Sequence, residues 1–299
     1  MKKVIITGAG GFVGSALTSK MISEGVEVIA ISRDFCPKFP RSRFVKKINS
    51  EIDDSEKILK LIPDDEYDAF YHLAWRGVNG TEKSDPISQI NNSKIALSCA
   101  YVAKKARCKK FLCAGTIAEN IVKNLSNMYK TNGGMLYGVA KHCTYLMLDT
   151  YCKNLGQEYV WMQFSNIYGP GNKTGNLISY TLEKLSKGEE AEFGPAKQLY
   201  DFVYIDDLIE AIYRLGFHKT RKNRYFIGSG EPRLLKDYLT YIGERLEKPE
   251  LIKIGVKRDD GIKYFSEMFD ISDLKEDIGD YNHMSFEKGI EETIKSIEV

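Results

Sequence analysis

The sequence has few of the residues that bind metals or form disulfide bonds. It contains four histidines and six cysteines among 299 residues, and no two cysteines form a C-x-x-C pair. Because disulfides are rare in reducing compartments, we interpret the cysteines as free thiols in a reducing cytoplasm, and we predict no metal site. They are Cys36, Cys99, Cys108, Cys113, Cys143 and Cys152.

The sequence also lacks a charge excess and a long apolar run. The 43 Lys and Arg residues nearly balance the 41 Asp and Glu residues, which leaves a formal net charge of +2. So small a charge creates no field that would attract a nucleic-acid backbone or an anionic membrane. No apolar run approaches the ~20 residues that cross a bilayer, and the chain opens with a strand pattern instead of a signal peptide. We therefore expect a cytoplasmic protein with no nucleic-acid or membrane partner.

What the sequence does contain is an alternation of apolar β-branched runs with helical periodicity. Helices are predicted over residues 87–106 and 136–154, between runs that are typical of buried strands. Such alternation predicts right-handed crossovers and a parallel sheet covered on both faces. The expected fold class is α/β, a doubly wound Rossmann-type parallel sheet with a smaller C-terminal substrate-binding lobe. The strand runs are Lys3–Thr7, Val26–Ile31, Asp68–Ala74 and Lys110–Ala114.

The composition changes after residue 168, where glycine, lysine and tyrosine become frequent. We predict a dinucleotide-binding domain over residues 1–168 and a mainly substrate-binding lobe over residues 169–299. Residues 201–215 again have the pattern of a short strand and a helix, which allows the chain to return to the first lobe there.

Three glycines, Gly8, Gly11 and Gly14, stand between the first strand and the first helix. Glycines at this spacing let the backbone turn tightly and approach a pyrophosphate, whose charge is received by the helix N-terminus. Strand, glycines and helix in this order are the context that the motif requires, so we predict a dinucleotide site. Its expected contacts are Thr7, Gly8, Gly10, Gly11, Phe12, Val13, Gly14, Glu51, Ile52, Leu73 and Ala74.

The tip of the second strand is Ser32-Arg33, where NAD-binding sheets place an acidic residue that binds the ribose hydroxyl. Serine has no charge to repel a 2′-phosphate, and the neighbouring guanidinium offers a planar fork for one. The pair predicts a preference for NADP(H), with NAD(H) possible. In the alternative interpretation Arg33 is a solvated strand-end charge and Asp34 takes the acidic role slightly later.

Tyr137 and Lys141 stand at positions i and i+4 of a predicted helix, so they are neighbours on one helical face. A cation held close to a phenol favours the phenolate and lowers its pKa toward values useful for proton transfer. Thr116, at the carboxyl end of a strand, can share the reacting oxygen with Tyr137. We predict catalytic roles for all three and cofactor contacts for Tyr137 and Lys141, which can reach the cofactor ribose. We discount a competing pair, Tyr129-Lys130, that lacks the i,i+4 spacing.

Several further motifs follow in order along the chain: Thr7-Gly8-x-x-Gly11-x-x-Gly14, His72-Leu73-Ala74, Asn91, Thr116, Tyr137 with Lys141, and Ser165-Asn166-Ile167-Tyr168-Gly169-Pro170-Gly171. In combination they resemble the extended short-chain dehydrogenase/reductases, Rossmann-fold enzymes that act on nucleotide-activated sugars. The resemblance runs from the first strand to the region of Tyr281 and Asn282, which is nearly the whole chain.

The resemblance implies hydride exchange between a nicotinamide and a sugar carbon, with Tyr137 as the general acid/base. It implies a proton-relay role for Asn91, a sugar-nucleotide contact for Asn166, and a diphosphate contact for Lys257 or Arg258. Trp75 follows a strand end and either borders the substrate or packs in the core. Tyr200 stands where most relatives carry arginine and either stacks on a base or packs as an ordinary strand residue.

Departures from the family pattern narrow the expected reaction. The catalytic threonine is followed by Ile117-Ala118, whereas the dehydratases of the family place Asp-Glu there, which argues against a dehydratase. Ser32 departs from the strand-tip acid of four-epimerases that hold NAD tightly, which favours reduction with NADPH. We expect a nucleotide-sugar 4-ketoreductase similar to the enzymes that make abequose. The alternatives are a 4-epimerase and a non-catalytic NADP-binding protein, and by family analogy we expect a homodimer.

Overall fold

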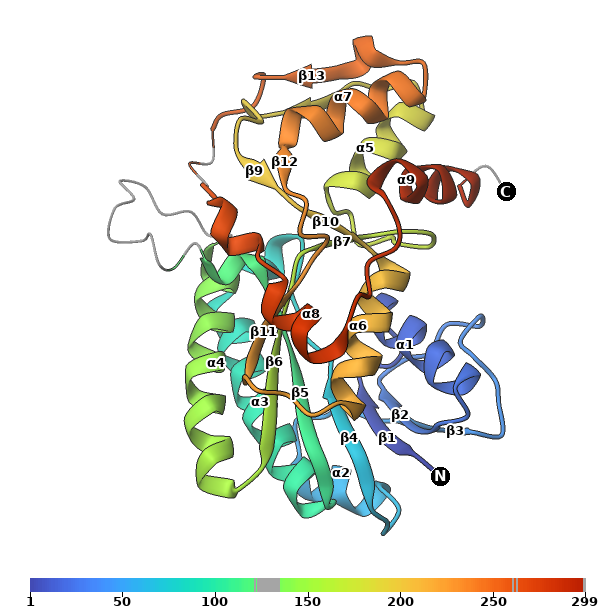
Figure 1. The fold of residues 1–299 in the computed structure, drawn as a ribbon, viewed down its shortest axis with the longest axis vertical. Coiled ribbons are helices and arrows are strands. Elements are labelled where there is room, and N and C mark those ends of the chain that lie inside the picture. The colour runs from blue at the N-terminus through green and yellow to red at the C-terminus, as the bar shows by residue number, and fades with distance from the viewer. Residues whose placement is uncertain (121, 123–134, 260, 262, 298–299) are drawn as a thin grey trace.

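A seven-stranded parallel sheet forms the centre of the larger lobe in the computed structural model, which describes residues 1–120, 122, 135–259, 261 and 263–297 (Figure 1). Every neighbouring pair of strands in this sheet is parallel. In spatial order the strands are β11 (Arg224–Ile227), β6 (Glu158–Phe164), β5 (Cys108–Thr116), β4 (Tyr67–His72), β1 (Lys3–Thr7), β2 (Glu27–Ser32) and β3 (Val45–Asn49).

Helices cover both faces of the sheet. On one face α2 (Ser55–Leu61) and α4 (Met135–Leu155) both contact α3 (Pro86–Lys105), and on the other face α1 (Phe12–Ser23) contacts α6 (Ile205–Phe217) (Figure 1). Alternate residues of β1 enter the two cores: Val4 and Ile6 join one, and Ile5 joins the other. A strand buried on both sides must be apolar throughout, so the α/β doubly wound fold predicted from the sequence is confirmed.

Four of the expected strands and both long helices are present with small shifts at their ends. The first strand has the predicted bounds, Lys3–Thr7, and α3 and α4 begin and end within one residue of the predicted 87–106 and 136–154. The order β3-β2-β1-β4-β5-β6 reverses direction between β1 and β4. Ligands of such sheets bind beyond the carboxyl ends of the strands at this reversal.

The smaller lobe lies above the carboxyl ends of the strands in Figure 1. Its parts pair as short ribbons, β8 with β13 in parallel and β9 with β12 antiparallel. A further parallel pair, β7 with β10, joins the lobes. The elements are β7 (Asn166–Tyr168), α5 (Leu177–Ser186), β8 (Ala191–Phe193), β9 (Leu199–Tyr200), β10 (Phe202–Tyr204), β12 (Arg233–Leu234), α7 (Leu235–Arg245), β13 (Ile252–Ile254) and α9 (Phe286–Lys295).

The chain returns to the larger lobe after residue 168. Helix α6 contacts β4, strand β11 extends the sheet beside β6, and α8 (Ser272–Ile278) contacts both α6 and β11. An ion pair of 2.8 Å between Lys20 of α1 and Glu210 of α6 ties the returning helix to the first one. The central sheet therefore contains strands from both sides of residue 168. The functional division of the chain at that residue stays a prediction.

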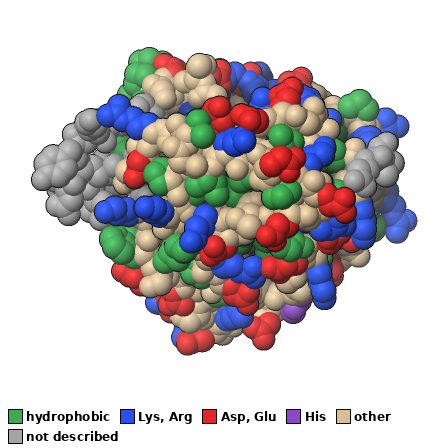
Figure 2. All heavy atoms as spheres, turned by 90° about the horizontal axis from the view of Figure 1, so that it is seen from above, with side chains coloured by type: hydrophobic (Ala, Val, Ile, Leu, Met, Phe, Trp, Pro, Cys, Tyr) green, Lys and Arg blue, Asp and Glu red, His purple; other side chains and the backbone are tan. Residues whose placement is uncertain are grey.

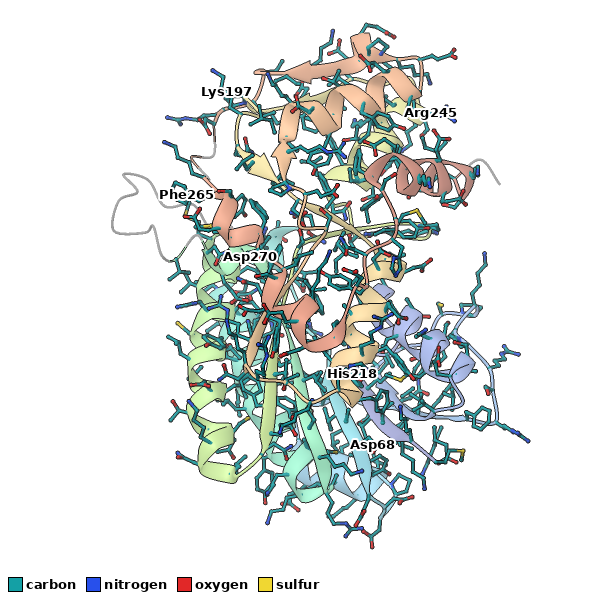
Figure 3. The ribbon with its side chains drawn as sticks, viewed as in Figure 1. Asp68, Lys197, His218, Arg245, Phe265 and Asp270 are labelled. Carbon is teal, nitrogen blue, oxygen red and sulfur yellow. The ribbon has the colours of Figure 1, made fainter. Side chains whose placement is uncertain are left out.

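Short 3-10 helices form some of the remaining connections between these elements. They are η1 (Thr81–Ser84), η3 (Pro249–Leu251) and η4 (Ser266–Phe269). Figure 3 shows Phe265 and Asp270 at the two ends of η4, where the lobes meet, with Lys197 and Arg245 on the smaller lobe and Asp68 and His218 on the larger. Seen from above, acidic and basic side chains are interspersed over the smaller lobe (Figure 2).

The structure also describes the apolar character of the helices and the state of the cysteines. Among the described residues, none of the helices combines the length and apolar character that crossing a bilayer requires. All six cysteines are free, with Cys36 and Cys143 exposed and the other four buried.

Candidate active site

The glycine turn after β1 has the close packing that only glycine permits. Gly8 has a φ of +74°, and a Cβ there would lie 2.6 Å from the backbone nitrogen of Ala74. A Cβ on Gly10 would lie 2.1 Å from the carbonyl oxygen of Asp34, and one on Gly14 would lie 2.2 Å from that of Gly8. The turn is therefore pressed against the segments that follow β2 and β4, and it leaves a cradle bounded by backbone alone.

Helix α1 starts directly from this turn with Gly11 as its N-cap, and no side chain caps it. The first amides of a helix lack partners within the helix and carry a partial positive charge. Since Gly8 and Gly11 line a cleft of about 660 Å³, these amides can receive an anion there. The residues present thus fit a dinucleotide pyrophosphate.

The cleft collects most of the residues predicted to bind the cofactor. Ser32 and Arg33 line it, whereas Asp34 is not among its described lining residues. The other predicted residues at the cleft are Gly8, Gly11, Glu51, Ile52, Leu73, Ala74, Trp75 and Asn91. The remaining predicted cofactor contacts lie nearby: Gly10 and Phe12 line an adjoining groove, Val13 packs against the core, Gly14 is buried, and Thr7 is bonded to the ring of His72 at 2.8 Å.

Tyr137 lies in the first turn of α4, and its hydroxyl shares a hydrogen bond with the side chain of Thr116 at the end of β5. Burial raises the pKa of Tyr137 well above its usual range, and the nearby Glu119 carboxylate raises it further. The Trp75 ring stands edge-on to the Tyr137 ring, with 6.3 Å between centroids. The structure thus brings the predicted acid and its hydroxyl partner together beside a residue of the cleft.

Lys141 is buried one helical turn beyond Tyr137. Its ammonium donates to the carbonyl oxygen of Ala114 at 2.6 Å and lies 3.7 Å from the centre of the Trp75 ring. Burial lowers the pKa of Lys141 to about 8, and the nearby Cys113 and Glu119 oppose that shift.

The expectation that Lys141 lowers the pKa of Tyr137 does not hold in this structure. Burial dominates the pKa of the phenol and raises it, because loss of water disfavours the phenolate. The ammonium is engaged by a carbonyl oxygen and an indole face instead. The i,i+4 spacing placed the two residues on one helical face without fixing where each polar group points.

Sequence reasoning missed the residues that hold Thr116. The carboxylate of Glu119 accepts a hydrogen bond of 2.7 Å from the Thr116 backbone amide, and Gln163 donates to the Thr116 carbonyl oxygen at 3.1 Å. Glu119 also accepts bonds from Trp161 and from Arg224. The one available signal was an acidic residue three positions after a strand end, a pattern equally typical of an exposed turn.

The neighbouring residues Asn91 and Asn92 of α3 have different surroundings. Asn91 is exposed and lines the cleft. Asn92 is buried and clamps the backbone of Arg76, accepting from its amide at 2.9 Å and donating to its carbonyl oxygen at 2.7 Å. Gln89, one turn earlier, accepts a bond of 2.9 Å from the Trp75 indole. These contacts fix the segment after β4 that carries the cleft-lining Trp75.

The predicted substrate residues fall in different places. Tyr200, Lys257 and Arg258 meet in a separate pocket of about 380 Å³ in the smaller lobe, which Tyr180 and Tyr264 also line. Asn166 lies apart from that pocket, at the start of β7, and its side chain donates to the carbonyl oxygen of Asp201 at 3.0 Å.

Two further sequence predictions concern a second tyrosine-lysine pair and metal binding. The discounted pair Tyr129-Lys130 lies outside the described residues. Within the part of the chain that the structure describes, no group of three or more histidine, cysteine, aspartate or glutamate side chains could hold a metal ion.

Comparison with known proteins gives a consistent picture. A family model described as the NAD dependent epimerase/dehydratase family matches residues 4–228. CDP-abequose synthase of Salmonella typhimurium is 25% identical over 308 aligned positions, which cover 98% of this chain and 98% of that protein. dTDP-4-dehydro-6-deoxy-D-allose reductase of a Streptomyces species is 25% identical over 320 positions, covering 98% and 95%.

Solved structures share the fold. The UDP-glucose 4-epimerase of Thermotoga maritima superposes with a TM-score of 0.81 at 21% identity, over 99% of this chain and 98% of that one. The UDP-N-acetylglucosamine 4-epimerase of Methanobrevibacter ruminantium gives a TM-score of 0.82 at 21% identity, with 99% and 98% covered. At this level of identity the likeness establishes architecture, and the reaction must be argued from the side chains.

Proposed function

Because the chain belongs to the NAD dependent epimerase/dehydratase family, it is an enzyme of the extended short-chain dehydrogenase/reductase type, and we propose that it reduces a 4-keto-6-deoxyhexose nucleotide with NADPH. The observation that carries this proposal is the arrangement of Tyr137, which is bonded to Thr116, stands edge-on to the cleft-lining Trp75 and lies one helical turn from Lys141. A raised pKa keeps the proton on a phenol at neutral pH, which is the state a proton donor needs. Carbonyl reduction requires such a donor, and the relatives named CDP-abequose synthase and dTDP-4-dehydro-6-deoxy-D-allose reductase support that direction.

The chain's own residues account for each proton position. When bound, NADPH supplies the hydride that adds to the ketone carbon and leaves as NADP⁺. Thr116 holds the ketone oxygen beside the Tyr137 hydroxyl, and Tyr137 gives its proton to that oxygen as the carbonyl π electrons move onto it. The resulting phenolate regains a proton from water.

NADPH is favoured over NADH by the end of the cleft where Ser32 and Arg33 lie. A guanidinium binds a phosphate with two parallel hydrogen bonds, and neither of these two residues repels one. Gly8 and Gly11 line the same cleft, and the N-terminus of α1 beside them can receive the pyrophosphate that NADPH and NADH share.

The substrate nucleotide fits the pocket of the smaller lobe. Lys257 and Arg258 supply positive charge for a diphosphate, and the Tyr200 ring offers a face on which a base can stack. The relatives named for CDP- and dTDP-linked sugars support this substrate class without choosing the base. We place the enzyme in the cytoplasm, where free thiols persist.

The homodimer is proposed from the surface of α3 and α4, which pack side by side. Ile87 and Ile90 of α3 are each 64% exposed, and Leu146 of α4 is 52% exposed. Exposed large apolar side chains on two adjacent helices are typical of protein interfaces. Sedimentation equilibrium should give twice the chain mass, and Ile90→Glu should shift it toward a monomer. A monomeric wild-type protein would contradict the dimer.

Stopped-flow spectroscopy tests the reaction. The wild-type protein mixed with NADPH and a CDP- or dTDP-linked 4-keto-6-deoxyhexose should consume NADPH at 340 nm in a 1:1 ratio with reduced sugar. A protein that consumes no NADPH, carries oxidised cofactor through purification and interconverts two sugars without net redox change would be the 4-epimerase instead. Absence of both activities would favour a non-catalytic protein.

A further inference from the structure

The carboxylate of Glu119 is completely buried and receives hydrogen bonds from three separate parts of the fold. The Thr116 amide, at the end of β5, donates to Oε1 at 2.7 Å. The Trp161 indole, on β6, donates to both oxygens at 3.0 Å. The Arg224 guanidinium, on β11, donates to Oε2 at 3.2 Å. Buried charges persist only when paired and hydrogen-bonded, and this one is built into the sheet.

The surroundings are shaped to admit this carboxylate. A Cβ on Gly115 would lie 2.3 Å from the Trp161 indole nitrogen and 2.7 Å from Glu119 Oε1, so only glycine leaves the space. Arg224 is held in turn by Tyr145 of α4, whose ring centre lies 4.6 Å from the guanidinium carbon. The arrangement therefore draws on β5, β6, β11 and α4 together.

Glu119 fixes the position of Thr116, whose side chain is bonded to the Tyr137 hydroxyl. Its carboxylate fixes the Thr116 amide, while Gln163 fixes the Thr116 carbonyl oxygen at 3.1 Å. The Thr116 side chain is then free to bond Tyr137. Small displacements of catalytic groups cost large factors in rate, so the clamp on Thr116 bears directly on proton transfer.

Glu119 also acts through its charge. Its carboxylate raises the pKa of Tyr137 and counters the lowering of the pKa of Lys141 by burial. Burial raises the pKa of Glu119 itself to about 7, against the hydrogen bonds from Thr116 and Trp161 and the charges of Arg224 and Lys141. The ionisable groups that sense it are Arg224 of β11, Tyr159 of β6, Cys113 of β5, and Tyr137 and Lys141 of α4.

On the basis of the proposed reduction, we propose that Glu119 is a positioning residue that fixes Thr116 against Tyr137 through its hydrogen bond with the Thr116 amide. It touches neither substrate nor cofactor. Its influence reaches the reaction through Thr116 and through the electrostatic field at the two α4 side chains.

The ionisation of Glu119 can be measured without any substrate. The chain has two tryptophans, so Trp75→Phe leaves Trp161, which bonds Glu119, as the single tryptophan, which excitation at long wavelength observes apart from tyrosine. The Trp75→Phe protein should show a Trp161 fluorescence transition with a midpoint near pH 7, and the added change Glu119→Gln should abolish it. Arg224→Met should move the midpoint to higher pH, because a partner cation favours the carboxylate. A transition that survives Glu119→Gln unchanged would overturn the assignment.

Steady-state kinetics then separate positioning from charge. Glu119→Gln should lower kcat for ketone reduction by about tenfold or more, with little change in KM. It should also shift the ionisation of Lys141 in the pH profile to lower pH, because the Glu119 charge raises the Lys141 pKa. Glu119→Asp keeps the charge on a shorter side chain, so it should lower kcat while leaving that ionisation near its wild-type position. Glu56→Gln, at an exposed position of α2, is the matched control and should change neither.

The outcomes distinguish this inference from the proposed function. If the wild-type protein fails to reduce any 4-keto sugar, the proposed function fails, while the fluorescence titration still decides whether Glu119 ionises as described. If the wild type reduces the sugar and Glu119→Gln, folded by circular dichroism, has a wild-type kcat and pH profile, the positioning role is wrong. If Glu119→Gln does not fold, the Arg224→Met midpoint shift decides the charge argument.

Discussion

The ammonium of Lys141 lies 3.7 Å from the centre of the Trp75 ring. The ring covers a buried cation whose hydrogen bond goes to the Ala114 carbonyl oxygen, and it also forms part of the cleft. An indole face attracts a cation by about 0.5–2 kcal/mol, depending on how far both are removed from water. Trp75 thus connects the cleft with the residues that we propose for proton transfer.

Removal of the Trp75 ring from the Lys141 ammonium should raise the pKa of Lys141. Trp75→Ala admits water, and because burial lowers the pKa of Lys141 to about 8, hydration should raise that pKa toward its ordinary value. NMR of ¹⁵N-lysine-labelled protein, with the signal assigned by its loss in Lys141→Met, measures the shift. Trp75→Phe keeps a ring face and should shift it less. An unchanged pKa in Trp75→Ala would contradict the covering role.

Removal of the reacting hydroxyl should abolish proton donation. Tyr137→Phe loses the hydroxyl bonded to Thr116, and we expect kcat to fall by about 10²- to 10⁴-fold with little change in substrate affinity. Stopped-flow consumption of NADPH measures it. Tyr151→Phe, on the same helix, should retain wild-type turnover, and full activity in Tyr137→Phe would assign the proton to another group.

Two glycines with nearly the same backbone conformation should respond differently to a methyl group. Gly25 has a φ of +68° with nothing within 4 Å of a Cβ, so Gly25→Ala should cost only the left-handed backbone, about 1–2 kcal/mol. Gly8→Ala adds a collision with the Ala74 backbone, so it should cost more and weaken NADPH binding. Urea unfolding and cofactor titration measure both effects. Equal losses in the two variants would remove the cradle argument.

The cofactor preference should depend on Arg33. Arg33→Ala is expected to weaken NADPH binding by about 10- to 100-fold, the effect of a charge-assisted hydrogen bond, and to leave NADH binding unchanged. Fluorescence titration with both cofactors measures the ratio. Arg41→Ala, at an exposed position outside the described cleft lining, is the control. Equal wild-type affinities for the two cofactors would refute the preference.

The free energy of unfolding should depend on pH through the ionisation of Glu119. Its pKa is 4.5 when exposed and about 7 in the folded protein, so the folded state holds more protons between these values. This group's contribution to the free energy of unfolding is therefore most favourable below about pH 4.5 and is lost as the pH rises to about 7. Denaturation of the wild type minus that of Glu119→Gln, measured from pH 5 to 8, should show the decline. A pH-independent difference would be inconsistent with this ionisation.

The local parts of the fold followed from the sequence, and the long-range parts did not. The run Lys3–Thr7 became β1 with the same bounds because a strand buried on both faces needs continuous apolar residues. Strand β11 was not predicted, since four residues carry too little periodicity and its pairing with β6 joins distant segments.

The long-range contacts of the candidate site could not be predicted from local sequence patterns either. The spacing of Tyr137 and Lys141 is local and placed both on one helix, but the partners of Lys141 come from the segments after β4 and within β5. Glu119 owes its burial to Trp161 and Arg224, which lie 42 and 105 residues further along the chain. No pattern of neighbouring residues reports such distances, so the sequence could indicate the reacting groups without indicating what supports them.

The course of the chain between the lobes has a consequence for how the molecule can be divided. Strand β11 and helices α6 and α8 all follow residue 168, so a fragment cut there would leave β6 as a bare sheet edge and strip α1 of its partner. Neither half is a self-sufficient module. An exchange of the smaller lobe between two relatives would therefore have to keep β11, α6 and α8 with the sheet that they complete.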